Sequence, residues 1–209
     1  MKRKEIAKQI QKILATLYPD PKPSLNATDP YTFLIAVMLS ANARDAIVNR
    51  ITPRLFAKAA TPERIVQLSV KEIEEIIRPC GLGPKKARAI WEMSRLLIDR
   101  FEGVVPRTFE DLESLPGVGH KTASVMMCQI FCQNAFPVDT HIHRCAKRWG
   151  LSTGKNVKQT EKDLKELFPE QEWARVHLQI IYFAREYCRA TGHNPTSCPM
   201  CSSLEAPDR

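Results

Sequence analysis

The chain has 209 residues, of which 44% are hydrophobic and 26% are charged, proportions that exclude an intrinsically disordered protein. Lysine and arginine outnumber aspartate and glutamate by 31 to 23, and the resulting net charge of +8 favours a partner that carries negative charge. The longest apolar run, Phe33 to Leu39, is too short to cross a bilayer, so we expect no membrane-spanning segment and no membrane partner.

The N-terminal residues, MKRKEIAKQIQKILATLY, predict an amphipathic helix because their apolar side chains recur at helical spacing between charged ones. They lack the small-residue cleavage site of a secretory signal, so the expected location is cytoplasmic. Seven cysteines at uneven spacing fit reduced thiols or metal ligands better than a set of disulfides.

Helix start signals recur along the chain and alternating strand patterns are nearly absent, so the predicted fold class is all-α. Capping side chains precede several expected helices, in the pairs Asp29-Pro30, Thr61-Pro62, Ser69 with Glu72, and Thr108 with Asp111. Longer apolar patterns predict helices over residues 84–101, 120–132, 140–149, 157–168 and 170–189.

Residues 115–123, LPGVGHKTA, predict a tight turn between two helices, with Gly117, Val118 and Gly119 in the turn and Lys121 just inside the second helix. Glycines let backbone N–H groups approach a phosphate oxygen closely, and the start of the second helix adds its positive end. Such a hairpin binds the DNA backbone without reading base sequence. A plain helix-to-helix corner is the alternative, and the two glycines and the net charge of +8 favour the DNA-binding hairpin.

LPGVGHKTA followed by VDTHIHR, with the earlier LSANARD and the C-terminal cysteines, resembles the endonuclease III family of helix-hairpin-helix DNA glycosylases. The resemblance extends from residue 3 to Cys201. It implies two helical domains with a DNA-binding cleft between them. Residues 23–133 are expected to form a six-helix domain that holds the helix-hairpin-helix, and residues 1–22 with 134–209 a second helical domain. The expected form is a monomer that binds double-stranded DNA.

The resemblance also implies that Lys121 in GHKTA is the nucleophile and Asp139 in VDTH its catalytic partner. An amine that attacks C1′ of a damaged nucleotide displaces the base and leaves an imine, from which the 3′ phosphate is lost by β-elimination. A helix N-terminus amid basic residues favours the neutral amine that this attack requires. Asp139 can accept a proton or stabilise the cationic sugar. Plainer roles are phosphate binding for Lys121 and helix capping for Asp139.

The expected activity is that of a bifunctional DNA glycosylase and apurinic/apyrimidinic (AP) lyase of base excision repair that acts on oxidised pyrimidines and abasic sites in duplex DNA. The resemblance separates the chain from adenine-excising relatives, which lack a lysine at the position of Lys121. The alternative is a non-catalytic helix-hairpin-helix module that binds DNA without turnover, and it leaves the VDTH motif unexplained.

A base rotated out of the duplex leaves a gap that the enzyme has to fill. The resemblance assigns this role to Asn42 in MLSANARD and Leu82 in CGLGPKKA. The family has glutamine at the position of Asn42, so the side chain here is one methylene shorter and reaches less far. Asp45 matches the acidic residue that closes the motif, with helix capping as an equal alternative. His141 is expected to lie near the cleft as a further DNA contact.

Family members commonly hold a [4Fe-4S] cluster on a C-x6-C-x2-C-x5-C motif. Here nine residues separate Cys188 from Cys198, and two residues separate Cys198 from Cys201. Pro207 stands where the fourth cysteine is expected. The first spacer is therefore longer than in the family and one thiolate is missing. We expect a labile metal site or none, with a structural role in either case.

Three alternatives follow from this departure. One is a cluster with a substitute ligand, either His193 or Asp208. The second is a zinc site, because the three C-terminal cysteines and His193 offer four sulfur and nitrogen ligands. The third is a chain without a metal. The remaining cysteines are predicted to be packed core thiols, and they are Cys80, Cys128, Cys132 and Cys145.

Overall fold

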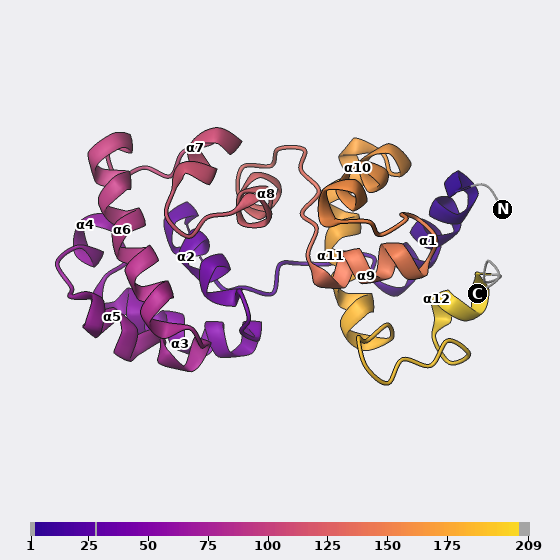
Figure 1. The fold of residues 1–209 in the computed structure, drawn as a ribbon, viewed down its shortest axis with the longest axis horizontal. Helices are drawn as coiled ribbons and strands as arrows, with labels where there is room; N and C mark the ends of the chain where they lie inside the picture. The colour runs from indigo at the N-terminus through magenta and orange to yellow at the C-terminus, as the bar shows by residue number, and fades with distance from the viewer. Residues whose placement is uncertain (1–2, 28, 205–209) are drawn as a thin grey trace. The chain divides into compact units, whose positions relative to one another are not determined.

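The computed structural model describes residues 3–27 and 29–204, and within these ranges every regular element is a helix (Figure 1). The predicted all-α fold class is therefore confirmed. None of the helices in these ranges combines the length and the apolar character that crossing a membrane requires. The chain divides into two compact units: unit 1 is Met1–Lys22 with Asn134–Arg209, and unit 2 is Pro23–Gln133.

Unit 1 joins the two ends of the chain around one hydrophobic core. Ile10 and Leu14 of the N-terminal helix are fully buried in the same core as Val176 and Ile180. In Figure 1 the indigo N-terminal helix accordingly lies among the orange and yellow helices of this unit. The elements are α1 (Arg3–Leu17), α9 (Thr140–Arg148), α10 (Val157–Leu167), the 3-10 helix η2 (Glu170–Glu172), α11 (Trp173–Glu186) and α12 (Pro199–Ser203).

Unit 2 is built around a helix with no polar face. All residues of α2 (Pro30–Ser40) from Tyr31 to Leu39 are buried. The other elements of the unit are α3 (Asp45–Lys58), the single turn α4 (Pro62–Ile65), α5 (Val70–Ile77), the 3-10 helix η1 (Arg78–Cys80), α6 (Gly83–Phe101), α7 (Phe109–Ser114) and α8 (His120–Gln129). Of these, α3, α6 and α8 pack against α2.

The predicted helix caps are present, with one difference. Asp29, Thr61 and Ser69 accept hydrogen bonds from backbone N–H groups of the first turns of α2, α4 and α5, and Glu72 completes the capping box of α5. At α7, Thr108 accepts from the Asp111 N–H, but the Asp111 carboxylate accepts from the Thr108 hydroxyl instead of its backbone. Aspartate is one methylene shorter than the glutamate of a full capping box, so this box is only half formed.

Two helices end earlier than their apolar patterns predict. The helix expected over 120–132 ends at Gln129, and Cys132 beyond it has a left-handed φ of 51°. Cys132 is therefore exposed, and the expectation that it is a core thiol is wrong. Cys80, Cys128 and Cys145 are buried as expected, and burial raises the pKa of Cys128 to about 12. The pattern over 170–189 becomes η2 and then α11, which ends at Glu186.

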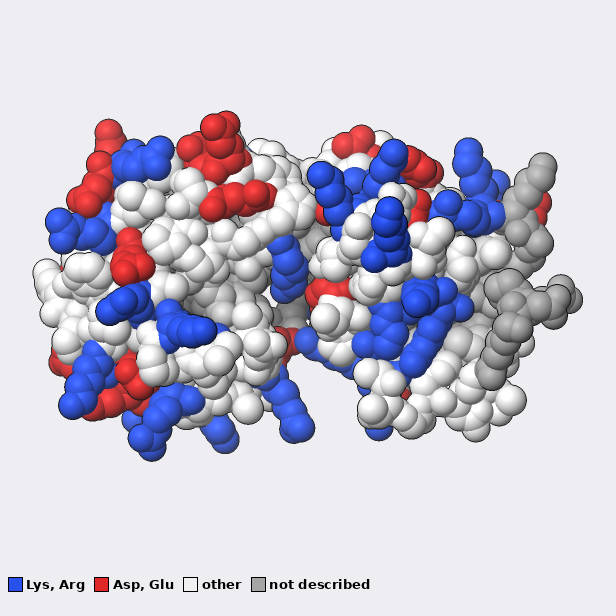
Figure 2. Space-filling view, in the orientation of Figure 1, with Lys and Arg blue, Asp and Glu red and all other residues white. Residues whose placement is uncertain are grey.

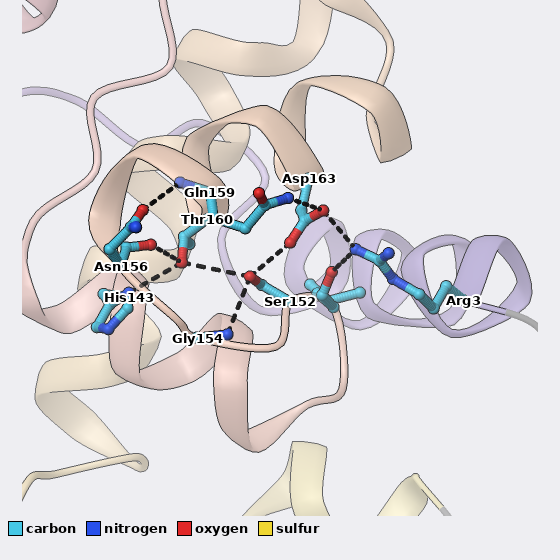
Figure 3. A network of polar contacts seen from close by, with 9 residues as sticks. Arg3, His143, Ser152, Gly154, Asn156, Gln159, Thr160 and Asp163 are labelled. Carbon is cyan, nitrogen blue, oxygen red and sulfur yellow. Dashed lines mark hydrogen bonds and ion pairs between the residues drawn. The ribbon is translucent and has the colours of Figure 1, made fainter.

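A buried carboxylate joins α1 to α10 and to the loop before α10 (Figure 3). Asp163 accepts hydrogen bonds from the Ser152 hydroxyl at 2.6 Å and from the Gln159 amide at 3.0 Å. Its Oδ1 also lies 3.1 Å from the guanidinium of Arg3, which donates a further hydrogen bond to the Leu151 carbonyl. Burial acts to raise the pKa of Asp163, but the hydrogen bonds from Ser152, Arg3 and Gln159 together hold it below its ordinary value.

Asp163→Asn is expected to destabilise the protein at neutral pH and to do so less in acid. A carboxyl with a lowered pKa in the folded state adds stability above its unfolded pKa, about 4, and this contribution is lost as the pH falls through the folded value. We expect the variant to lose about 1–3 kcal/mol in free energy of unfolding at pH 7. Urea unfolding between pH 7 and about pH 2 measures the difference, because the contribution is lost only below about pH 4; the exposed Asp99→Asn serves as control. A loss that stays constant across this range would contradict the expectation.

Candidate functional site

The turn between α7 and α8 carries the LPGVG sequence and places Lys121 in the first turn of α8. The Val118 N–H donates to the Leu115 carbonyl at 3.1 Å and closes the turn. The Val118 side chain is buried, so any partner outside the protein meets this residue through its backbone. Lys121 is half-buried and belongs to unit 2.

The two glycines of the turn have different roles. Gly117 has a left-handed φ of 80°, and a Cβ there would lie 2.8 Å from both Met38 Cε and Ala89 Cβ. Packing within unit 2 therefore requires this glycine, and its predicted contact with DNA stays a prediction. Gly119 has an ordinary φ of −98°, and a Cβ there would meet nothing within 4 Å. Gly119 is thus the glycine that faces open space.

Gly119 also occupies the N-cap position of α8 and, having no side chain, provides no capping hydrogen bond there. The same position is capped by a side chain at α9, where Asp139 accepts from the N–H groups of His141 and Ile142, both at 2.9 Å. A helix start without a side-chain cap presents its N–H groups to an external acceptor. The cap on α9 uses Oδ1 of Asp139 alone.

Polar contacts hold α9, the helix that Asp139 caps, within unit 1. The ring Nδ1 of His143 lies 2.9 Å from the Thr160 hydroxyl, which joins α9 to the network of Figure 3. Arg144 donates to the Cys188 carbonyl at 2.9 and 3.1 Å and to Nδ1 of His141 at 3.1 Å. Figure 2 shows basic side chains gathered where Figure 1 places α9, and the last turn of this helix is basic.

Asn42 and Leu82 lie on separate loops of unit 2 and share an unusual backbone conformation. Their φ values are 60° and 52°, in the left-handed region that residues other than glycine rarely adopt. The Leu82 side chain is 54% exposed. A leucine that is both exposed and left-handed is unfavourable on each count, and such positions cluster at functional sites.

Lys86 of α6 connects these two loops, and the sequence analysis did not identify it. Its buried ammonium donates to the carbonyls of Leu39 at 2.8 Å, Ala41 at 2.7 Å and Cys80 at 2.9 Å. Leu39 and Ala41 come just before Asn42, and Cys80 comes just before Leu82. In the sequence, Lys86 is a lysine beside the apolar positions of an amphipathic helix. Lysines in such positions are too common to indicate a role.

Near the C-terminus, Cys188, His193 and Cys201 place their ligand atoms within 4.8 Å of one another. Cys198 is buried at the start of α12 but is not one of the three residues of this converging group. Pro207 and Asp208 fall outside the described residues.

This convergence does not fit a [4Fe-4S] cluster. The thiolates of such a cluster bind four different irons at its corners and point toward it from different sides, so they stay apart. Here the ligand atoms of Cys188, His193 and Cys201 all lie within 4.8 Å of one another. The arrangement leaves no room between them for a body of several irons and sulfides.

Comparisons with known proteins identify the family of the chain. Residues 35–170 match the family model of the HhH-GPD superfamily base excision DNA repair proteins. Endonuclease III of Bacillus subtilis (strain 168) is 36% identical over 190 residues, covering 90% of this chain and 87% of that protein. Endonuclease III of Treponema pallidum (strain Nichols) is 41% identical over 180 residues, covering 86% of this chain and 85% of that protein.

A solved structure of a trapped endonuclease III–DNA covalent intermediate superimposes with a TM-score of 0.91 at 38% identity and covers 96% of this chain and 94% of that one. The long coverage and the identity apply to the whole fold, including both units. The chain therefore belongs to the HhH-GPD superfamily of base excision DNA repair proteins and, within it, to the endonuclease III family of DNA glycosylases and AP lyases.

Proposed function

We propose that this enzyme removes oxidised pyrimidines from double-stranded DNA and cleaves the strand at the resulting abasic site, acting as a monomer with Lys121 as its nucleophile. The observation that carries the proposal is the position of Lys121, half-buried in the first turn of α8 and directly after the hairpin. Support comes from the similarity to a protein trapped as a covalent intermediate with DNA.

In the proposed reaction the neutral amine of Lys121 forms a bond from Nζ to C1′, and the bond from C1′ to the base breaks with its electron pair on the base. Ring opening of the sugar then gives a protonated imine. Its positive charge makes the C2′ proton acidic, and removal of that proton expels the 3′ phosphate by cleavage of the C3′–O bond. Hydrolysis of the imine releases the 5′ fragment and regenerates the lysine.

Asp139 is proposed to stabilise the positive charge that develops on the sugar and to accept a proton during the attack. The α9 cap uses only Oδ1, so capping and catalysis are compatible roles for one carboxylate. The contacts of His143 and Arg144 hold the helix that Asp139 caps. His141, in the first turn of the same helix, is proposed as a neighbouring DNA contact.

The hairpin is proposed to bind a DNA phosphate at the start of α8, and Gly119→Ala tests this role. A methyl group at Gly119 would occupy open space in front of the helix start, where the phosphate is expected. We expect about tenfold weaker binding to a duplex with a tetrahydrofuran abasic analogue, measured by fluorescence anisotropy. Thermal unfolding should change little.

Gly117→Ala serves as the contrasting variant. Its new Cβ would collide with Met38 and Ala89 and would be held at a positive φ. We therefore expect a stability loss of about 1–3 kcal/mol, with weaker binding only to the extent that the protein unfolds. If Gly119→Ala bound the duplex as tightly as the parent, the hairpin would not hold the phosphate in the proposed way.

Asn42 and Leu82 are proposed to fill the gap left by the flipped nucleotide, and Lys86 to hold both loops in position. Lys86→Met keeps most of the side-chain volume but removes the ammonium that three carbonyls share. We expect base excision to slow by about 100-fold, because displaced loops no longer support the extrahelical nucleotide. Cleavage of a preformed abasic site should slow less, since there is no base to rotate out.

Single-turnover rates of base excision and of cleavage at a preformed abasic site measure how far Lys86→Met slows each step. Lys85→Met is the matched control, because Lys85 precedes Lys86 on α6 but is exposed. Equal slowing of excision and of abasic-site cleavage would mean that Lys86 supports the fold generally instead of positioning the gap-filling loops.

The proposed substrate class is tested with duplex oligonucleotides that carry thymine glycol, an undamaged thymine or an abasic site. Denaturing gels should show cleavage at thymine glycol and at the abasic site, with a β-elimination end, and intact undamaged strands. The alternative of a non-catalytic binding module predicts intact strands throughout. Such a result, obtained with protein that binds the same duplexes, would overturn the proposed function.

A further inference from the structure

The Cys/His group at the C-terminal end of unit 1 has the dimensions of a site for one metal ion. The Cys201 Sγ and the His193 Nε2 are 3.5 Å apart. In a tetrahedral zinc site, bond lengths of about 2.3 Å to sulfur and about 2.0 Å to nitrogen place two such ligand atoms roughly 3.5 Å apart. Cys188 completes a group whose ligand atoms all lie within 4.8 Å of one another.

We propose that Cys188, His193, Cys198 and Cys201 bind a single zinc ion in place of the iron–sulfur cluster of the family. Sulfur and imidazole ligands in this number are those of structural zinc sites. The site is independent of the DNA chemistry proposed above, because none of its residues has a role in that chemistry.

Cys198 is assigned as the fourth ligand because it is buried and precedes Cys201, a member of the converging group, by the C-x2-C spacing of zinc knuckles. The two cysteines flank the start of α12, where the Ser202 N–H donates to the Cys198 carbonyl at 2.9 Å. The competing candidate is Cys145 of α9, which is buried in the same core as Cys188. Cys145 has no such pairing with a neighbouring ligand.

The surroundings of the group suit a thiolate-rich site. Three thiolates and one neutral histidine around Zn²⁺ leave one net negative charge. Arg148 can balance this charge, because its Nη1 donates to the Cys188 Sγ at 3.3 Å. Gly192 has a left-handed φ of 67°, so the chain turns just before His193. A metal ion here would fix the segment between α11 and α12 without contributing to catalysis.

The test is the metal content of the full-length protein after anaerobic purification from medium that supplies both iron and zinc. We expect one zinc per chain by elemental analysis and no visible absorption of an iron–sulfur cluster. Replacement of zinc by Co²⁺ should give the intense spectrum of a tetrahedral cobalt–thiolate site. About four irons per chain with a brown colour would overturn the proposal. Purified protein without zinc that also fails to bind zinc on anaerobic reconstitution would overturn it as well.

Variants distinguish the two candidates for the fourth ligand. His193→Ala and Cys198→Ser should each bind zinc at least about 100-fold more weakly in competition with a chelator, whereas Cys145→Ala should bind it as the parent does. Circular dichroism confirms that each variant is folded. Loss of zinc in folded Cys145→Ala together with full retention in Cys198→Ser would overturn the assigned ligand set.

Discussion

Lys121→Ala is expected to abolish base removal and strand cleavage while leaving affinity for abasic duplex DNA nearly unchanged. The alanine side chain has no amine to bond to C1′ and form the imine. The variant keeps the hairpin, since the turn is closed by backbone contacts and by Val118 packing. Loss of a covalent nucleophile typically reduces turnover by far more than about a thousandfold.

Borohydride reduction provides the direct measurement, because it converts the imine into a stable amine and so links the enzyme to its DNA. The parent should give a shifted band on a denaturing gel, and Lys121→Ala should give none. Lys71→Ala, which changes an exposed lysine of α5 in the same unit, should trap as well as the parent. A trapped adduct of undiminished yield with Lys121→Ala would assign the nucleophile to another residue.

Asp139→Asn is expected to remove most of the activity without weakening α9. Asparagine caps a helix about as well as aspartate, so its side-chain oxygen can still accept from the His141 and Ile142 N–H groups. What the variant loses is the negative charge beside the developing sugar cation. We expect excision to slow by about 10²–10⁴-fold with an unchanged melting temperature.

Asp139→Ala separates the two roles of this residue. It removes the cap as well as the charge, so it should lose about 1 kcal/mol of stability in addition to activity. Melting curves and single-turnover excision rates on thymine glycol duplex compare the three proteins. If Asp139→Asn retained full activity and only Asp139→Ala lost it, the carboxylate would be a helix cap without a catalytic role.

The sequence predicts most helices of this fold because their start signals are local. A capping side chain, a following proline and an apolar period all lie within one or two turns of each other. α3 shows the limit of such signals, since it begins without a side-chain cap and contains Pro53, so its formation depends on packing in unit 2. Helix ends are harder to predict, since Gln129 and Glu186 end helices inside patterns that continue for several residues.

The residues of the candidate site likewise differ in whether the signal for them is local in the sequence. Lys121 and Asp139 stand in short motifs, so the sequence indicates them directly. Lys86 could not be identified, because its role depends on three carbonyls that belong to distant turns of the chain. The packing constraint on Gly117 could not be identified for a related reason: it comes from Met38 and Ala89, which only the fold brings beside it.

The insertion of unit 2 between the two segments of unit 1 determines the order in which the protein can fold during translation. α1 leaves the ribosome first, but α10 and α11, which contact it, are synthesised only after residues 23–133. Until then the apolar side chains of Ile10 and Leu14 lack their native core and are available to chaperones. Unit 2 is continuous in sequence, so we expect a nascent chain arrested after residue 133 has emerged to present a folded unit 2 preceded by an unpacked N-terminal segment.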